Sequence, residues 1–163
     1  MNIFLIGMMG SGKSTIGFLL AKRIKKPFID LDEEIERSTK KTITDIFKID
    51  GEDTFRKIET EHLKKVSDSV ISCGGGIILK EQNRNLIKNN GVAILLIAST
   101  KILTNRLKYS EKRPLLEKNS IKESLHELWL KRQAYYLSTA DITIDTDGKT
   151  PGIITNEILF NLK

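Results

Sequence analysis

Residues 7–14 read Gly-Met-Met-Gly-Ser-Gly-Lys-Ser, between an apolar run and an amphipathic segment. They fit the pattern G-x-x-x-x-G-K-[ST] without a mismatch, in the strand–loop–helix context that the pattern requires. Glycines allow successive N–H groups to point at phosphate, and the following helix adds the positive end of its dipole. The stretch therefore predicts a nucleotide phosphate loop, with Lys13 on the β- and γ-phosphates and the Ser14 hydroxyl on Mg²⁺. A glycine-rich turn made for packing alone is the alternative, and it leaves the Gly-Lys-Ser register unexplained.

Strand-like and helix-like segments alternate about five times along the chain. The expected strands are 2–6, 28–29 with its end at 30–32, 70–73, 92–97 and 142–144, the last at a sheet edge; the expected helices begin at residue 13 and cover 42–66 with a break near 50–51, 80–89, 101–108, 121–137 and 150–162. Because parallel strands are joined by right-handed helical crossovers, this predicts a single-domain α/β P-loop fold over residues 1–163. We expect a parallel sheet of about five strands with helices on both faces. Ligands should bind where the strands end, in one cleft.

Size and composition indicate one soluble domain. The chain has 163 residues, of which 39% are hydrophobic and 29% charged. Its longest apolar runs, 3–6 and 92–98, are far shorter than the ~20 residues of a membrane helix, and no secretory signal pattern is visible. The one cysteine, Cys73, excludes an internal disulfide and a cysteine-rich zinc site. We therefore expect a cytoplasmic protein without a membrane partner.

The charge balance favours anionic partners. The formal net charge is +6, from 27 Lys and Arg against 21 Asp and Glu. Bases concentrate at 22–26 and 101–113, but no aromatic residues alternate with them as a stacking platform for nucleic acid would require. We expect no nucleic-acid partner, and we interpret most of these charges as solvated helix faces.

Two carboxylates, Asp30 and Asp32, end the second expected strand. Side chains alternate along a strand, so both should point to the same side. Beside a nucleotide, one could order the waters of Mg²⁺ and the other could hold, and help deprotonate, an acceptor hydroxyl. The alternative is that Asp32 caps the next helix, and the residues alone leave both interpretations open.

Two arginines lie on different expected helices, one beside an apolar stripe and the other on an apolar face. Glu59 follows Arg56 by three residues, and it either forms an ordinary ion pair with Arg56 or positions it to grip a carboxylate. Arg132 lies on the apolar face of a later helix, where a snorkelling surface arginine is the alternative. Two arginines in one cleft would suit an anionic substrate better than a neutral sugar. The three glycines at 74–76 either offer bare backbone to a ligand or form a tight turn.

A basic segment lies between two expected helices, and it contains Arg113-Pro114-Leu115-Leu116. A mobile segment above a nucleotide could close as a lid, exclude water and bring Arg113 onto the phosphates. We place this lid at about 109–120; an ordinary solvent loop is the alternative.

Taken in order, these stretches closely resemble the shikimate kinase family, within the nucleoside-monophosphate-kinase fold group. The matching pieces are G-M-M-G-S-G-K-S from Gly7, D-L-D from Asp30, G-E-D-T-F-R-K-I-E from Gly51, G-G-G from Gly74, R-P-L-L from Arg113 and K-R-Q-A-Y-Y from Lys131. The phosphate loop belongs to many families, but this combination is much more specific. The resemblance implies that ATP phosphorylates the 3-hydroxyl of shikimate to give shikimate 3-phosphate and ADP, on the route to chorismate and the aromatic amino acids. It also favours a monomer.

The resemblance further implies a role for each matching residue. Asp32 would hold the acceptor hydroxyl as base or orienting group, Asp30 would order Mg²⁺ through water, and Arg113 would reach the ATP phosphates. The substrate-binding helical segment would span about 31–66. The implied catalytic residues are Lys13, Asp32 and Arg113; the implied ATP-binding residues are Gly10, Ser11, Gly12, Lys13, Ser14, Thr15, Arg106, Arg113 and Pro151; the implied shikimate-binding residues are Asp32, Phe47, Phe55, Arg56, Gly74, Gly75, Gly76 and Arg132; the implied metal ligands are Ser14 and Asp30.

Other functions fit the chain less well. A P-loop kinase for a nucleoside monophosphate should show a base-binding pocket, which the sequence does not suggest. A gluconate kinase is excluded only weakly by the arginine clamp, and better by F-R-x-x-E together with R-P-L-L. A non-catalytic ATP-binding module should lack Asp32 or a clamp arginine, and all are present.

Overall fold

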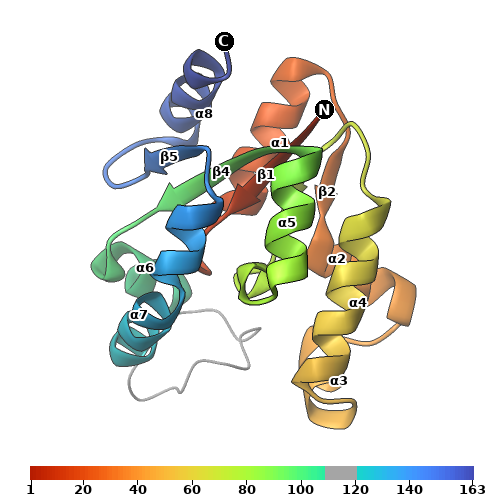
Figure 1. Ribbon diagram of the computed structural model, residues 1–163. Helices are drawn as coiled ribbons and strands as arrows, with labels where there is room; N and C mark the ends of the chain where they lie inside the picture. Colours follow the sequence, from red (N-terminus) through yellow and green to blue (C-terminus); the bar gives the residue numbers. More distant parts are fainter. Residues whose placement is uncertain (109–120) are drawn as a thin grey trace.

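The computed structural model describes residues 1–108 and 121–163, and the expected lid with Arg113 lies outside these described residues. The described part contains a five-stranded parallel sheet in the order β2-β3-β1-β4-β5 (Figure 1). The strands are β1 (Asn2–Ile6), β2 (Phe28–Asp30), β3 (Val70–Ser72), β4 (Gly91–Ile97) and β5 (Ile142–Asp145). The helices are α1 (Lys13–Ile24), α2 (Leu31–Thr39), α3 (Ile43–Ile49), α4 (Glu52–Lys65), the 3-10 helix η1 (Ile77–Leu79), α5 (Glu81–Asn90), α6 (Thr100–Leu107), α7 (Ile121–Thr139) and α8 (Pro151–Asn161). The predicted α/β fold is confirmed.

The central strand is β1, which pairs with β3 on one side and β4 on the other. All five of its residues are buried, as expected for a strand covered on both faces. By contrast, β5 lies at an edge and shows the alternating exposure that its sequence predicts.

Alternate residues of β1 join two apolar cores, one on each face of the sheet. Ile3 and Leu5 pack with residues of α1 and α8, whereas Phe4 and Ile6 pack with residues of α4, α5, α6 and α7. A third, smaller cluster, built around Ile35, joins α2, α3 and α4 beyond the sheet. The helices therefore cover both faces (Figure 1), and α2–α4 form an outlying unit beside one edge.

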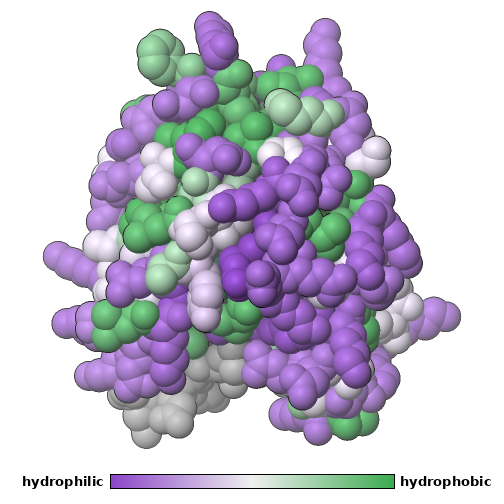
Figure 2. All heavy atoms as spheres, viewed as in Figure 1, coloured by the Kyte–Doolittle hydropathy of each residue, from purple (hydrophilic) through white to green (hydrophobic). Residues whose placement is uncertain are grey.

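The outer surface is mainly polar. Figure 2 shows hydrophilic side chains over most of the face that is seen in Figure 1, with hydrophobic residues in separate small areas. Within the described ranges, every helix is too short or too polar to span a bilayer.

One local prediction is wrong. The second strand does not continue to Asp32 but ends at Asp30, and α2 begins at Leu31. The Asp30 side chain accepts hydrogen bonds from the backbone N–H groups of Asp32 and Glu33, so Asp30 is the N-cap of α2. Asp32 consequently lies in the first turn of a helix, and strand alternation does not set its direction.

Candidate active site

Two cavities lie where the strands end, and Ser14 lines both of them. The first, here called the clamp cavity, has a volume of about 390 Å³. Its lining comprises Met9, Ser14, Asp30, Asp32, Glu33, Glu36, Thr42, Ile43, Thr44, Phe47, Phe55, Arg56, Glu59, Gly74, Gly75, Gly76 and Arg132. The second, here called the loop cavity, has a volume of about 350 Å³ and is lined by Gly10, Ser11, Gly12, Lys13, Ser14, Thr15, Ile16, Arg106, Lys149, Pro151 and Ile154.

The residues predicted to bind shikimate line one cavity, and the described residues predicted to bind ATP line the other. All eight residues expected to bind shikimate line the clamp cavity. Every described residue expected to bind ATP lines the loop cavity. The expected metal ligands Ser14 and Asp30 lie at the clamp cavity, and Ser14 is the point where the cavities adjoin.

The phosphate loop has the backbone shape that its sequence predicts. Gly12 has a φ of 98° and immediately precedes the first residue of α1, a conformation that favours glycine. The Nζ of Lys13 donates hydrogen bonds to the carbonyls of Gly7 and Met8, both at 2.9 Å. Arg106 donates from Nη1 to the carbonyl of Gly10 at 2.9 Å. The lysine and the arginine thus lie on the loop itself, where phosphate would add acceptors.

The carboxylate of Asp30 connects this loop to α2. Its Oδ2 accepts a hydrogen bond from the Ser14 hydroxyl at 2.6 Å, while its Oδ1 accepts from the backbone N–H of Asp32 at 3.1 Å. Asp32 is the second residue of α2, and Asp30 caps this helix. The hydrogen bond between Ser14 and Asp30 therefore links the position of Asp32 to the phosphate loop.

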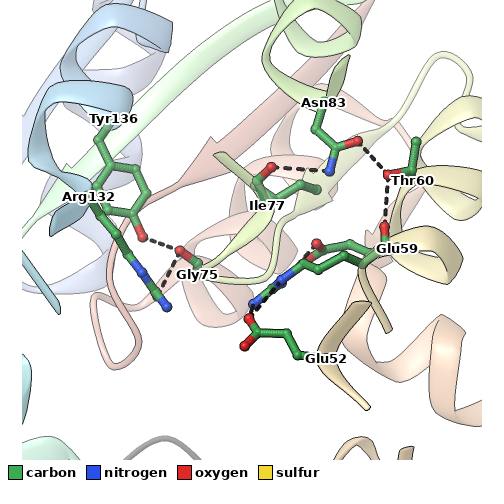
Figure 3. A network of polar contacts seen from close by, with 9 residues as sticks. Glu52, Glu59, Thr60, Gly75, Ile77, Asn83, Arg132 and Tyr136 are labelled. Atoms are coloured by element: carbon green, nitrogen blue, oxygen red, sulfur yellow. Dashed lines mark hydrogen bonds and ion pairs between the residues drawn. The ribbon is translucent and has the colours of Figure 1, made fainter. Parts of the chain in front are cut away.

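Arg56 is buried in the lining of the clamp cavity and is held by two carboxylates, those of Glu59 and Glu52, which are labelled in Figure 3. Its Nη1 contacts Glu59 Oε2 at 2.9 Å, and its Nη2 contacts Glu52 Oε1 at 3.0 Å. Burial lowers the pKa of Arg56, but Glu59 and Glu52 outweigh that effect and raise it, so the guanidinium stays charged. Its carbon Cζ lies 5.0 Å from the centre of the Phe55 ring, a cation–π distance.

Glu59 is the most unusual group of the site. Its side chain is fully buried, and its Oε1 has no hydrogen-bond partner among the described residues. Burial raises the pKa of Glu59 to about 7, against the lowering effect of Arg56. The carboxyl therefore changes its charge near neutral pH, beside the arginine that it holds.

Arg132 approaches the cavity from α7, on the other side of the three glycines (Figure 3). Its Nη1 donates to the carbonyl of Gly75 at 3.1 Å, and the Tyr136 hydroxyl donates to the same oxygen. Both side chains are buried, so Arg132 is not a surface arginine.

The glycines at 74–76 form a turn, and two of them also leave room for charged groups. A Cβ at Gly76 would lie 2.1 Å from Nη2 of Arg56, and one at Gly74 would lie 2.8 Å from Oε1 of Glu59. A Cβ at Gly75 would meet nothing closer than 3.6 Å. The outer two glycines therefore let the backbone approach the charged side chains closely.

Several residues near the cavities carried no signal in the sequence. Thr60 on α4 donates to Asn83 Oδ1 at 2.8 Å, and Asn83 on α5 donates to the carbonyl of Ile77 at 3.1 Å (Figure 3). This buried chain of contacts joins α4 to the segment that follows the glycines. Tyr136 stands in the matching piece K-R-Q-A-Y-Y but was given no role, because an aromatic residue on a helix face usually indicates only core packing.

The chain is similar to known proteins over nearly its whole length. The family model described as shikimate kinase matches residues 9–163. A shikimate kinase of Persephonella marina is 42% identical over 165 residues, which cover 99% of each chain. The structure of a shikimate kinase from Acinetobacter baumannii in complex with shikimate is similar with a TM-score of 0.95 and 34% identity, covering 99% of this chain and 92% of that one. A gluconokinase from Sinorhizobium meliloti is 22% identical with a TM-score of 0.58, over 99% of this chain and 90% of that one, and shares the fold alone.

A first prediction concerns Gly76. Gly76→Ala should lower the free energy of unfolding by about 1–3 kcal/mol, because the added methyl group forces Arg56 away from its two carboxylates. Gly75→Ala is the matched control, since its methyl group meets only ordinary contacts. Urea unfolding of the two variants measures the difference. Equal stability of the two variants would contradict the close packing of Arg56 on Gly76.

A second prediction concerns the proton on Glu59. The unfolded carboxyl titrates near 4.5 and the folded one near 7, so between these values the folded chain holds a proton that the unfolded chain has released. This raised pKa contributes stability that is complete below pH 4.5 and is lost as the pH rises to about 7. The wild type should therefore lose stability relative to Glu59→Gln over this range and not above it. A stability difference that does not change with pH would show that the carboxyl keeps an ordinary pKa.

Proposed function

The chain belongs to the shikimate kinase family, and we propose that it binds shikimate in the clamp cavity and ATP in the loop cavity. Its activity is the ATP-dependent phosphorylation of the 3-hydroxyl of shikimate, which gives shikimate 3-phosphate and ADP in aromatic biosynthesis. The observation that supports the two binding sites best is that Ser14 lines both cavities. An acceptor in one cavity and a nucleotide in the other would meet at the end of the phosphate loop.

The clamp cavity offers positive charge for a carboxylate. Arg56 and Arg132 reach it from helices on opposite sides of the glycines, and both are buried and tied to fixed partners. Charge-assisted hydrogen bonds from planar guanidinium groups are strong and directional. The carboxylate of shikimate would thus be oriented by side chains that are already in place, which lowers the entropy lost on binding.

Asp32 is the group that would act on the acceptor hydroxyl. It is half-buried in the lining of the clamp cavity, and its Oδ1 lies 3.0 Å from the position that a Cβ at Gly74 would take. A carboxylate there can accept a hydrogen bond from the hydroxyl and take its proton as the new bond to phosphorus forms. Lys13, on the phosphate loop, would offset negative charge on the β- and γ-phosphates.

The residues of the loop also fit Mg²⁺. Ser14 and Asp30 present two oxygen ligands that lie 2.6 Å apart. Within the described residues no cluster of three metal-ligating side chains occurs, which suits an ion that takes its other ligands from phosphate and water. When bound, Mg²⁺ would neutralise charge on the phosphates. Ser14 and Asp30 would hold it, Asp30 through water.

We also propose that the protein acts as a monomer in the cytoplasm, without nucleic-acid or membrane partners. Residues of one chain line both cavities, so neither lining needs a second subunit. The single cysteine, Cys73, is buried, and burial raises the pKa of its thiol well above the usual value, as suits an unreactive core residue.

A third prediction tests the acceptor. ADP release should be strong with Mg-ATP and shikimate, and weak with gluconate, AMP or no acceptor. The clamp cavity has charge for a carboxylate but no feature that we assign to a nucleotide base. A coupled assay with the four conditions measures the preference. Faster turnover with gluconate or AMP would contradict the proposed use of the arginine pair.

A fourth prediction separates the two cavities. Arg132→Lys should raise the KM for shikimate about 10- to 100-fold and change the KM for ATP little, because lysine keeps the charge but lacks the planar fork. Arg106→Ala should raise the KM for ATP about 3- to 10-fold and leave that for shikimate unchanged, since Arg106 lines only the loop cavity. Steady-state kinetics with each substrate varied in turn measures both effects. Equal loss for both substrates in either variant would count against separate sites.

A further inference from the structure

The carbonyl of Gly75 accepts two hydrogen bonds from one helix. Arg132 and Tyr136, one turn apart on α7, both donate to this oxygen (Figure 3). Arg132 also lines the clamp cavity, whereas Tyr136 does not. The tyrosine therefore acts on the glycine segment from behind the cavity wall.

The side chain of Tyr136 is packed in the core. Its side chain is fully buried, and its ring stacks on Trp129 with 6.1 Å between the ring centres and 19° between the planes. Burial raises the pKa of Tyr136 to about 12, although Arg132 lowers it, so the hydroxyl keeps its proton over the range of enzyme assays. A fixed ring with a protonated hydroxyl is a constant donor to the Gly75 carbonyl.

This carbonyl controls the direction of the next N–H group. The described chain has no cis peptide bond, so the carbonyl of Gly75 and the N–H of Gly76 point in opposite directions across one planar unit. Holding the carbonyl toward α7 therefore turns the Gly76 N–H away from α7. Two other N–H groups of this turn, those of Ile77 and Leu79, are bonded to the carbonyls of Gly74 and Gly76. Among the described residues, the Gly76 N–H has no acceptor.

We propose that Tyr136 is a positioning residue for the acceptor: its hydroxyl fixes the peptide between Gly75 and Gly76, so that the Gly76 N–H faces the clamp cavity and Arg132 keeps donors for the substrate. This inference rests on the proposed binding of shikimate in that cavity. Without the hydroxyl, Arg132 would be the one remaining side-chain donor to this carbonyl in the described structure, and the peptide could rotate more freely.

The competing explanation is that Tyr136 only fills the core. Its ring, stacked on Trp129, would then matter, and its hydroxyl, which also lies 4.0 Å from the sulfur of Met8, would not. Phenylalanine keeps the ring and removes only the hydroxyl, so Tyr136→Phe separates the two explanations. Its neighbour Tyr135 is the matched control, because its ring is partly exposed and contacts the guanidinium of Arg84.

A fifth prediction follows for these two variants. Tyr136→Phe should raise the KM for shikimate about 3- to 10-fold, the loss of roughly one neutral hydrogen bond, with kcat and the KM for ATP within about twofold of wild type. Tyr135→Phe should match the wild type in all three constants. The increase should be the same in weakly acidic and weakly basic buffers, because the tyrosine stays protonated. A melting curve for each variant shows that the fold is retained.

Different results would overturn the inference alone or the proposed function with it. A Tyr136→Phe enzyme with the wild-type KM for shikimate, or with equal increases in KM for shikimate and ATP, would overturn the inference alone and leave a packing role. A wild-type enzyme without shikimate-dependent ADP release would overturn the proposed function, and the inference with it. Isothermal calorimetry with shikimate checks the same contact without turnover, and unchanged affinity in Tyr136→Phe would again refute it.

Discussion

The common direction of the five strands is the constraint on which the site depends. Because every strand is parallel to its neighbours, the carboxyl ends of all five strands lie at the same end of the sheet. The phosphate loop follows β1, Asp30 ends β2, and the three glycines follow β3. These segments are far apart in the sequence, and the order β2-β3-β1 places them side by side. Helical crossovers bring the chain back to the start of each next strand. The functional residues therefore lie at or just after the carboxyl ends of the strands, and the sheet sets the distances between them.

Ion pairs and hydrogen bonds to charged side chains fix the groups of the site in place before a substrate binds. Arg56 sits between Glu59, which is fully buried, and Glu52, which is half exposed. Burying such a pair is expensive, and a buried ion pair is weak evidence for stability. Its value here lies in placement: the guanidinium is fixed against Gly76 at one wall of the clamp cavity. Asp30 does the same on the other side, where one carboxylate joins Ser14 to the start of α2.

Local patterns in the sequence predicted much of this arrangement. The apolar runs and the glycine-rich loop are short-range signals, and they predicted the sheet and the phosphate loop. The prediction that the second strand runs to Asp32 was wrong, because Asp30 caps α2 and the strand ends there; Asp30 and Asp32 nevertheless both line the clamp cavity. Tyr136 could not be found in this way: it contacts Gly75 across 61 residues, and its helix position indicates only a core aromatic. Phe47 and Phe55 were expected mainly from resemblance, and they line the cavity.

The stacking of Trp129 on Tyr136 also gives the protein a natural optical reporter. Trp129 is the only tryptophan in the chain, and one ring separates it from the Gly75 carbonyl. Indole emission depends on the polarity and rigidity of its surroundings. Intrinsic fluorescence therefore observes the wall of the clamp cavity from a half-buried side chain packed behind it, with no dye and no engineered label.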